Sequence, residues 1–299
     1  APSSLMGIPF QLQSQQGIQQ AKALLAENKI MIKKETSPSE PFGVQPAKNA
    51  STPKPNMATA AKVNAMVGNR TWFGGLFTGS GKKRQVHAER NFEMTPLQEQ
   101  RMQKLKDRLN IPFDETRPDH LTSLKALWKV SFPDTELTSL VSEQWKDMGW
   151  QGPNPATDFR GGGFVSLENL LFFARRYPAS FQKLLLKTQG MRATWEYPFA
   201  TAGVNISHML IQLLELNSAR PKTLPGINFV RMLSEHEDVL DILYCIAFEM
   251  MDAQWLAMRA SYMQFNDVLE ATKAQLEREL SLEDLLRIQD LPAYNLLLK

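Results

Sequence analysis

The chain has little cysteine: among its 299 residues only Cys245 carries a thiol. A single thiol cannot form a disulfide within the chain, which argues against the disulfide-rich secreted scaffolds and fits a reducing compartment. Cys245 lies in the apolar run ILYCIAFEMM, so we expect it to be a small buried hydrophobic residue rather than a reactive one. A cytoplasmic protein is therefore expected.

Long hydrophobic runs are also lacking. No apolar stretch approaches the roughly 18 residues that a membrane span requires, so no transmembrane segment is expected. The first residues, APSSLMGIPF, have neither the basic start nor the long apolar centre of a secretory signal. The alternating apolar and polar pattern of strands is nearly absent, which favours an all-α protein.

Acidic residues are scarce in the N-terminal part of the chain. Residues 1–84 contain eleven Lys or Arg against three Glu, whereas the rest of the chain carries a net charge of about −5. Residues 1–70 are also poor in aromatics and rich in Ser, Pro, Gln, Lys and Ala, so we expect a disordered basic tail. Such a tail either stays solvated or makes peripheral contact with an anionic membrane surface. No nucleic-acid partner is expected.

Residues 71–94 differ from the tail because TWFGGLFTGSGKKR places three aromatics before a basic triplet. This composition predicts a connecting segment, which is either a plain hinge or a part that touches a membrane or partner. The run GGLFTGSGKK resembles a phosphate-binding loop only superficially, because Lys83 stands where Ser or Thr should bind magnesium.

Helical signals dominate residues 95–299, which we interpret as one domain. Thr95, Pro96 and Gln98 form the pattern of an N-cap, a first-turn proline and a capping-box partner. A last short helix is expected to open at Ser281, with Asp284 as its capping partner. The remaining helices are expected at 119–131, 134–148, 166–177, 178–188, 195–217, 226–234 and 237–279.

The helix expected at 237–279 is the longest. Apolar residues recur along it at alternating steps of four and three, which predicts a stripe packed against another helix. The stripe comprises Met258, Tyr262, Phe265, Leu269, Thr272 and Leu276.

Most patterns that carry chemistry are missing. The four histidines have no ligand spacing and no cysteine partners, so no metal site is expected. There is no serine nucleophile elbow and no kinase motif set. Carboxylate pairs such as Glu235 and Glu237 lie in polar stretches of the sequence. They give no reason to expect general acid–base catalysis.

The segment GWQGPNPATDFRGGGF, residues 149–164, is the least typical of the chain. Gly149 is placed where a left-handed residue would end the preceding helix. The prolines hold the middle extended, and Gly161 and Gly163 allow a sharp bend directly after Arg160. These features predict a rigid elbow with Arg160 at its apex.

Two roles compete for Arg160. As a brace, it would pair with Asp158 or with carbonyls, since five donors in a fork suit loop cross-linking. As a functional group, it would enter the phosphate site of a partner and neutralise charge that develops during phosphoryl transfer. Thr157 or Asp158 is expected to cap the helix that follows.

The pattern W-x3-G-W-Q-x3-P-x2-D-F-R-G-x-G-x3-L-x2-L resembles the signature of the ELMO-domain (engulfment and cell motility) family. The residues that carry it before the closing leucines are Trp145, Gly149, Trp150, Gln151, Pro155, Asp158, Phe159, Arg160, Gly161 and Gly163. The runs LKALW and YCIAFEMMDAQWLAMRASYMQFN resemble the plant branch of single-domain members. The resemblance covers about residues 70–299.

The resemblance implies an all-helical domain over residues 95–299 and, for the short members, activation of Arf-family small GTPases in signalling. In those members the motif arginine, here Arg160, is the proposed catalytic arginine finger. The implied partner is an Arf- or Arl-like GTPase, which the resemblance favours over a Rho or Rop protein. GTP and magnesium would belong to that partner, so this chain would be an activator with no cofactor and no substrate pocket of its own.

The alternative is a non-catalytic adaptor or scaffold that binds a small GTPase or its regulator. Larger relatives use the domain in this way and carry armadillo-like repeats, a PH domain and a proline-rich tail. This sequence shows none of those additions, which favours the activator interpretation.

Overall fold

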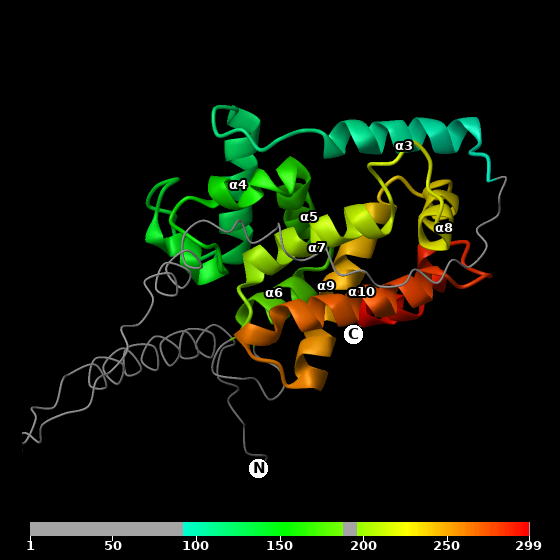
Figure 1. Cartoon of the computed structure of the whole chain (residues 1–299). Helices are drawn as coiled ribbons and strands as arrows, with labels where there is room; N and C mark the ends of the chain where they lie inside the picture. The colour runs from blue at the N-terminus through cyan, green and yellow to red at the C-terminus, as the bar shows by residue number, and fades with distance from the viewer. Residues whose placement is uncertain (1–91, 188–195, 299) are drawn as a thin grey trace, which may run out of the picture. The chain divides into compact units, whose positions relative to one another are not determined.

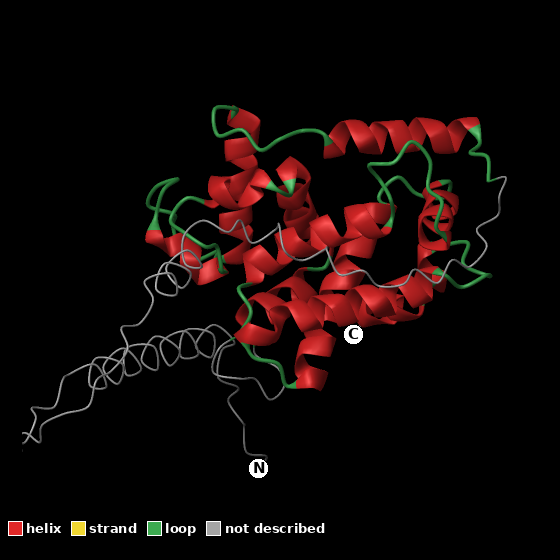
Figure 2. Ribbon diagram, viewed as in Figure 1, coloured by secondary structure: helices red, strands yellow, loops and turns green. Residues whose placement is uncertain are grey.

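The computed structural model describes residues 92–187 and 196–298. The expected disordered tail and most of the expected connecting segment lie outside these residues. Figure 2 shows helices joined by loops, and the part of the chain that the structure describes contains no strand. The all-α prediction is confirmed. No helix in these two ranges is long and apolar enough to cross a bilayer.

The first described helix, α3 (Pro96–Leu109), begins as its capping signals predict. Thr95 Oγ1 accepts a hydrogen bond from the Gln98 amide at 3.3 Å, and Gln98 Oε1 accepts one from the Thr95 amide at 2.9 Å. Near the other end of α3, Arg108 donates to Glu168 at 2.8 Å and to Asp241 at 2.9 Å. Because these two carboxylates belong to different helices, Arg108 fixes the C-terminal end of α3 against the body of the domain.

The core forms around three helices: α5 (Gly163–Arg176), α7 (Phe199–Leu213) and α9 (Val239–Met258). Figure 1 shows α5, α7 and α9 in the middle of the domain, with other helices around them. The ring of Phe248 on α9 stacks on Phe199 of α7 with centroids 4.9 Å apart. Cys245 is fully buried, as predicted, and burial raises the pKa of its thiol well above the ordinary value. The thiol is therefore protonated and unreactive at neutral pH.

Four further helices surround this core. Their bounds are α4 (Pro118–Ser131), α6 (Pro178–Leu186), α8 (Leu224–Leu233) and α10 (Phe265–Leu280). Three of them, α4, α6 and α8, lie close to ranges that the sequence predicts. Helix α4 packs against α5, and α10 packs against α9. The segment around Arg160 packs against α5 and α7.

The prediction of one continuous helix over 237–279 is wrong. Helix α9 ends where Arg259 adopts a left-handed conformation with φ of 49°, and a new turn starts when Ser261 and Gln264 form a capping box. Met258 and Tyr262, at this break, are 39% and 45% exposed, whereas the four later residues of the predicted stripe are buried. Periodicity alone missed the break because two helices that pack on the same core show nearly the same spacing.

The helix predicted over 134–148 is also wrong for most of its length. Gln144 uses both ends of its amide: Oε1 accepts from the Thr138 amide at 2.9 Å, and Nε2 donates to the Glu136 carbonyl at 2.9 Å. These bonds satisfy backbone groups that a helix would otherwise pair, so residues 134–142 form a loop. Only the short 3₁₀ helix η1 (Glu143–Met148) remains.

The helix predicted from Ser281 does not form. The Ser281 hydroxyl donates back to the Glu277 carbonyl at 2.6 Å, so it ends α10 rather than starting a new helix. Two short 3₁₀ helices follow, η4 (Ile288–Asp290) and η5 (Pro292–Leu298).

Candidate functional site

Residues 149–164, which we call the elbow, join η1 to α5. Trp145 in η1 is fully buried, its ring lies edge-on to Trp128 with centroids 5.2 Å apart, and its indole nitrogen donates to the Leu140 carbonyl at 3.1 Å. Gly149 ends η1 with φ of 92°, as the sequence predicts. The elbow therefore starts from a fixed point in the core.

Gly149 also ties the elbow to the start of α7. Its carbonyl accepts hydrogen bonds from the Thr201 amide at 3.3 Å and from the Thr201 hydroxyl at 2.8 Å. A Cβ at this position would lie 2.4 Å from the Phe199 amide nitrogen. Glycine is required here both for its backbone conformation and because another backbone passes so close.

The middle of the elbow is the 3₁₀ helix η2 (Pro155–Arg160). Asn154 caps it, since its Oδ1 accepts from the Ala156 amide at 3.0 Å. The prediction that Thr157 or Asp158 caps the following helix is wrong, because Asp158 Oδ2 accepts from the Gln151 amide at 3.0 Å and the N-cap of α5 is Gly162, which has no side chain to cap it. Asp158 thus links η2 to the first residues of the elbow.

Asp158 is 4% exposed, and burial raises the pKa of its carboxyl, while the Gln151 amide bond acts in the opposite direction. At pH 7 we expect Asp158→Asn to keep the unfolding free energy equal or raise it, because Asn retains an acceptor and removes a buried charge. Asp158→Ala leaves the Gln151 amide unpaired and should lower the unfolding free energy by about 1–3 kcal/mol. Urea denaturation of the two variants measures both effects.

The same carboxyl gives a pH dependence of defined sign. An unfolded Asp ionises near pH ~3.9, and the folded pKa lies above the ordinary value. The stabilisation that the Asp158 carboxyl contributes is therefore fully present below that pH, and it is lost as the pH rises through the folded pKa. The Asp158→Asn variant should lack this loss. Equal destabilisation by Asn and Ala would contradict this account, since it would mean that the ionised carboxylate itself stabilises the elbow.

Aromatic packing holds the residue before Arg160. Phe159 is 1% exposed, and its ring stacks on Phe113 at 4.6 Å and meets Trp150 edge-on at 5.0 Å. On the far side of Arg160, Gly163 has φ of 65°, and the Phe164 amide donates to the Ile111 carbonyl at 2.9 Å. The backbone on both sides of Arg160 is therefore fixed to the core.

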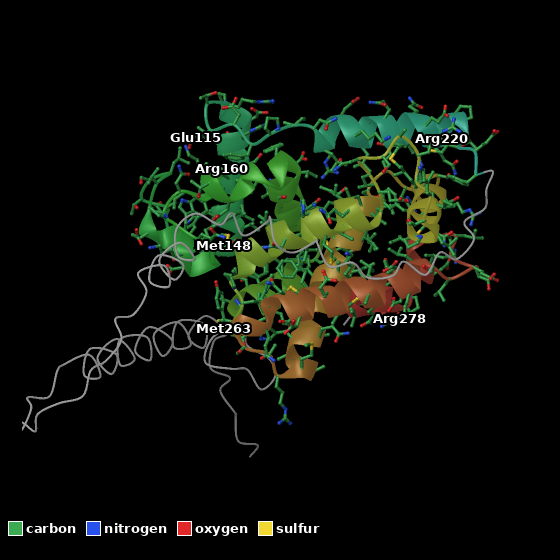
Figure 3. All side chains as sticks on the ribbon, viewed as in Figure 1. Glu115, Met148, Arg160, Arg220, Met263 and Arg278 are labelled. Atoms are coloured by element: carbon green, nitrogen blue, oxygen red, sulfur yellow. The ribbon has the colours of Figure 1, made fainter. Side chains whose placement is uncertain are left out.

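Arg160 itself is exposed at the C-terminal end of η2 (Figure 3). No described residue forms a hydrogen bond or ion pair with its guanidinium, and the Asp158 carboxylate is engaged by the backbone instead. The predicted brace between Arg160 and Asp158 is not present. Gly161 has an ordinary φ of −98°, so the bend depends on Gly163 rather than on both glycines.

The ten motif residues occupy one continuous segment, but they serve different purposes. The buried ones, Trp145, Trp150, Pro155, Asp158 and Phe159, build the support. Gln151 is exposed and contributes its backbone amide. Arg160 is the motif residue whose charged side chain is left facing solvent.

His120 is one of the supporting residues that sequence reasoning missed. Its ring lies parallel to Phe164 with centroids 3.8 Å apart, and Nδ1 accepts from the Asp114 amide at 3.0 Å. The residue is fully buried, and nothing in its sequence neighbourhood predicts a partner 44 positions away. Across the two described ranges, no group of three His, Cys, Asp or Glu side chains is arranged to hold a metal ion.

Comparison with known proteins places this segment inside a larger match. Residues 103–269 match the sequence model of the ELMO/CED-12 family. ELMO domain-containing protein A of Dictyostelium discoideum is 32% identical over 59% of this chain and 20% of its own length. ELMO domain-containing protein 2 of Mus musculus is 32% identical over 52% of this chain and 51% of its own length. Engulfment and cell motility protein 3 of Mus musculus is 26% identical over 60% of this chain and 26% of its own length. The chain therefore spans well under two thirds of the length of each of these relatives.

Proposed function

The chain belongs to the ELMO/CED-12 family, and from that membership we propose that it works with a small GTPase and stimulates GTP hydrolysis by an Arf-family member. Family membership supports the coarser part, the association with a small GTPase. The finer part, activation by Arg160 supplied in trans, rests on the geometry of the elbow.

The observation that carries the proposal is the contrast between Arg160 and its surroundings. Phe159, on one side, is buried. On the other side, Gly163 is held in place because the amide of the next residue, Phe164, donates to the Ile111 carbonyl. Arg160, between them, is exposed. A guanidinium that must act on another molecule needs a fixed base and a free end. The elbow supplies both.

The chemistry follows from the shape of the guanidinium. During hydrolysis, negative charge spreads over the oxygens of the transferred phosphoryl group and the leaving oxygen. Arg160 can donate two parallel hydrogen bonds to such oxygens, which stabilises that charge more in the transition state than in the ground state. An arginine finger of this kind accelerates hydrolysis by about 10³–10⁵-fold, or roughly 4–7 kcal/mol of barrier.

Asp158 has a positioning role in this mechanism. It holds η2 against the Gln151 amide and does not contact Arg160. GTP and its magnesium ion are bound by the GTPase, so the proposed activator needs no cofactor of its own.

Single-turnover hydrolysis by a panel of GTP-loaded GTPases tests the proposal. The panel should include Arf, Arl, Rho and Rop proteins, each with and without catalytic amounts of this chain. We expect stimulation of at least one Arf-family member by about 10³-fold or more. Binding of a GTP-loaded protein without stimulation would support the adaptor function instead, and neither binding nor stimulation would contradict both.

A further inference from the structure

A cleft of about 230 Å³ lies beside the elbow. Its walls come from the residues before and within α4, from the loop over 134–142 and from the start of η2. The residues on which the argument depends are Phe113, Glu115, Leu121, Leu140, Val141 and Asn154. Figure 3 labels Glu115 at the same end of the domain as Arg160.

The cleft is apolar inside and small. Leu121, Leu124 and Leu140 contribute aliphatic walls, and Val141 at the edge is 59% exposed. Sites for free small molecules usually enclose about 300–1,000 Å³, so this volume suits one large apolar side chain better than a metabolite. Burying such a side chain there would stabilise a complex by about 1.5–3 kcal/mol.

The rim of the cleft is negatively charged. Glu115 accepts a hydrogen bond from Asn154 Nδ2 at 3.2 Å, which holds its carboxylate at the mouth. The neighbouring Asp114 accepts two hydrogen bonds from Thr116, and these lower the pKa of its carboxyl, so it is ionised at neutral pH. The nearby cation Arg117 is paired with Asp119 at 2.6 Å. A side chain flanked by Lys or Arg would meet complementary charge here.

The cleft and Arg160 lie at opposite ends of one short element. Asn154 caps the start of η2 and lines the cleft, whereas Arg160 is the last residue of η2. Six residues of 3₁₀ helix span roughly 12 Å, at about 2 Å a residue. One face of a globular partner can therefore contact both points at once.

We infer that this cleft is a docking site for the small GTPase, and that it receives one exposed apolar side chain flanked by Lys or Arg on that partner. This inference rests on the proposed function. The two contact points carry opposite charges, since Arg160 meets phosphate and Glu115 meets a cation. Because the two contacts differ in charge and lie apart along η2, the partner cannot bind with them exchanged.

Two variants test the cleft without touching the elbow backbone. Val141→Asp places a charge at the apolar edge, and Glu115→Lys reverses the charge of the rim. Glu283→Lys, an exposed position in the loop after α10, is the matched control for charge reversal. We expect both cleft variants to raise the KM for the stimulated GTPase about tenfold, as the loss of one well-placed contact does, while kcat stays within about twofold.

Binding of the GTPase loaded with a non-hydrolysable GTP analogue gives a second readout that does not depend on hydrolysis. The cleft variants should weaken this binding about tenfold, and a Lys or Arg to Glu change on the partner should restore binding to Glu115→Lys. Unchanged KM and binding, with normal stimulation by the unmodified chain, would overturn the inference and leave the proposed function standing. Weakened binding in a chain that stimulates nothing would support the cleft and contradict the catalytic proposal.

Two other results would also overturn the inference. Tighter binding or stronger stimulation by the cleft variants would mean that residues of this chain normally occupy the cleft. A complete failure of the unmodified chain to bind any GTP-loaded GTPase would remove the docking site together with the proposed function. Thermal unfolding midpoints of Val141→Asp and Glu115→Lys should stay close to that of Glu283→Lys, since both altered side chains are exposed and the one bond lost, from Asn154 to Glu115, lies at the surface.

Discussion

Replacing Arg160 with lysine is expected to remove most of the stimulation of GTP hydrolysis while the domain stays folded. Lysine keeps the positive charge but lacks the planar fork that binds two phosphoryl oxygens together. We expect the stimulated rate to fall by about 10³-fold or more, the contribution of an arginine finger. Because Arg160 is exposed and bonded to no described residue, the free energy of unfolding should change by less than about 0.5 kcal/mol.

Arg175→Lys provides the matched control, since Arg175 is an exposed arginine in the last turn of α5. Single-turnover hydrolysis and urea denaturation of both variants are measured side by side, together with binding of the GTP-loaded partner. Normal stimulation by Arg160→Lys would show that the arginine assignment is wrong. A loss of about 2 kcal/mol or more in unfolding free energy would instead identify Arg160 as a brace, since exposed positions without a structural role change stability far less.

Alanine at position 149 should be the most damaging of the small changes in the elbow. Gly149 has φ of 92°, and its added Cβ would lie 2.4 Å from the Phe199 nitrogen and 2.8 Å from the Pro198 carbonyl carbon. Backbone strain and overpacking each contribute about 1–3 kcal/mol, so we expect the free energy of unfolding to fall by about 2–6 kcal/mol. Chemical denaturation followed by tryptophan fluorescence reports this directly, since Trp145 and Trp150 flank the site.

Gly152→Ala is the control, because a Cβ there meets no atom within 4 Å and the backbone is not left-handed. We expect its unfolding free energy to stay within about 1 kcal/mol of the unmodified chain. If Gly149→Ala were as mild as Gly152→Ala, the junction between the elbow and α7 would have to be much looser than the distances indicate.

Local sequence signals predicted those parts of the fold that local chemistry determines. The capping box at Thr95 and the left-handed residue at Gly149 both depend on a few adjacent positions, and both are confirmed. The break at Arg259 was missed because no glycine or proline marks it, and the apolar spacing continues across it. The loop over 134–142 was missed because one side chain, Gln144, satisfies two of its backbone groups.

In the candidate site, too, the sequence predicts the features that adjacent residues determine and misses those that depend on distant ones. The motif identifies Arg160 and the glycine at the bend, but it contains no sign of Ile111, Thr201 or His120, which reach the elbow from other helices and loops. The cleft was beyond prediction for the same reason: Phe113, Leu121 and Leu140 meet only through tertiary packing. Even the role of Asp158 changed, since its buried contact to the Gln151 amide is set by how the elbow closes.

The absence of a described partner for the Arg160 guanidinium has a consequence in conformational entropy. A solvated arginine side chain retains about 2 kcal/mol of rotamer freedom, and no internal ion pair restricts it beforehand. A ligand that captures the guanidinium must therefore offset that ordering at the moment of contact. In the proposed mechanism, Arg160 therefore contributes less to the stability of the resting complex than to that of the transition state, where developing charge orders its side chain.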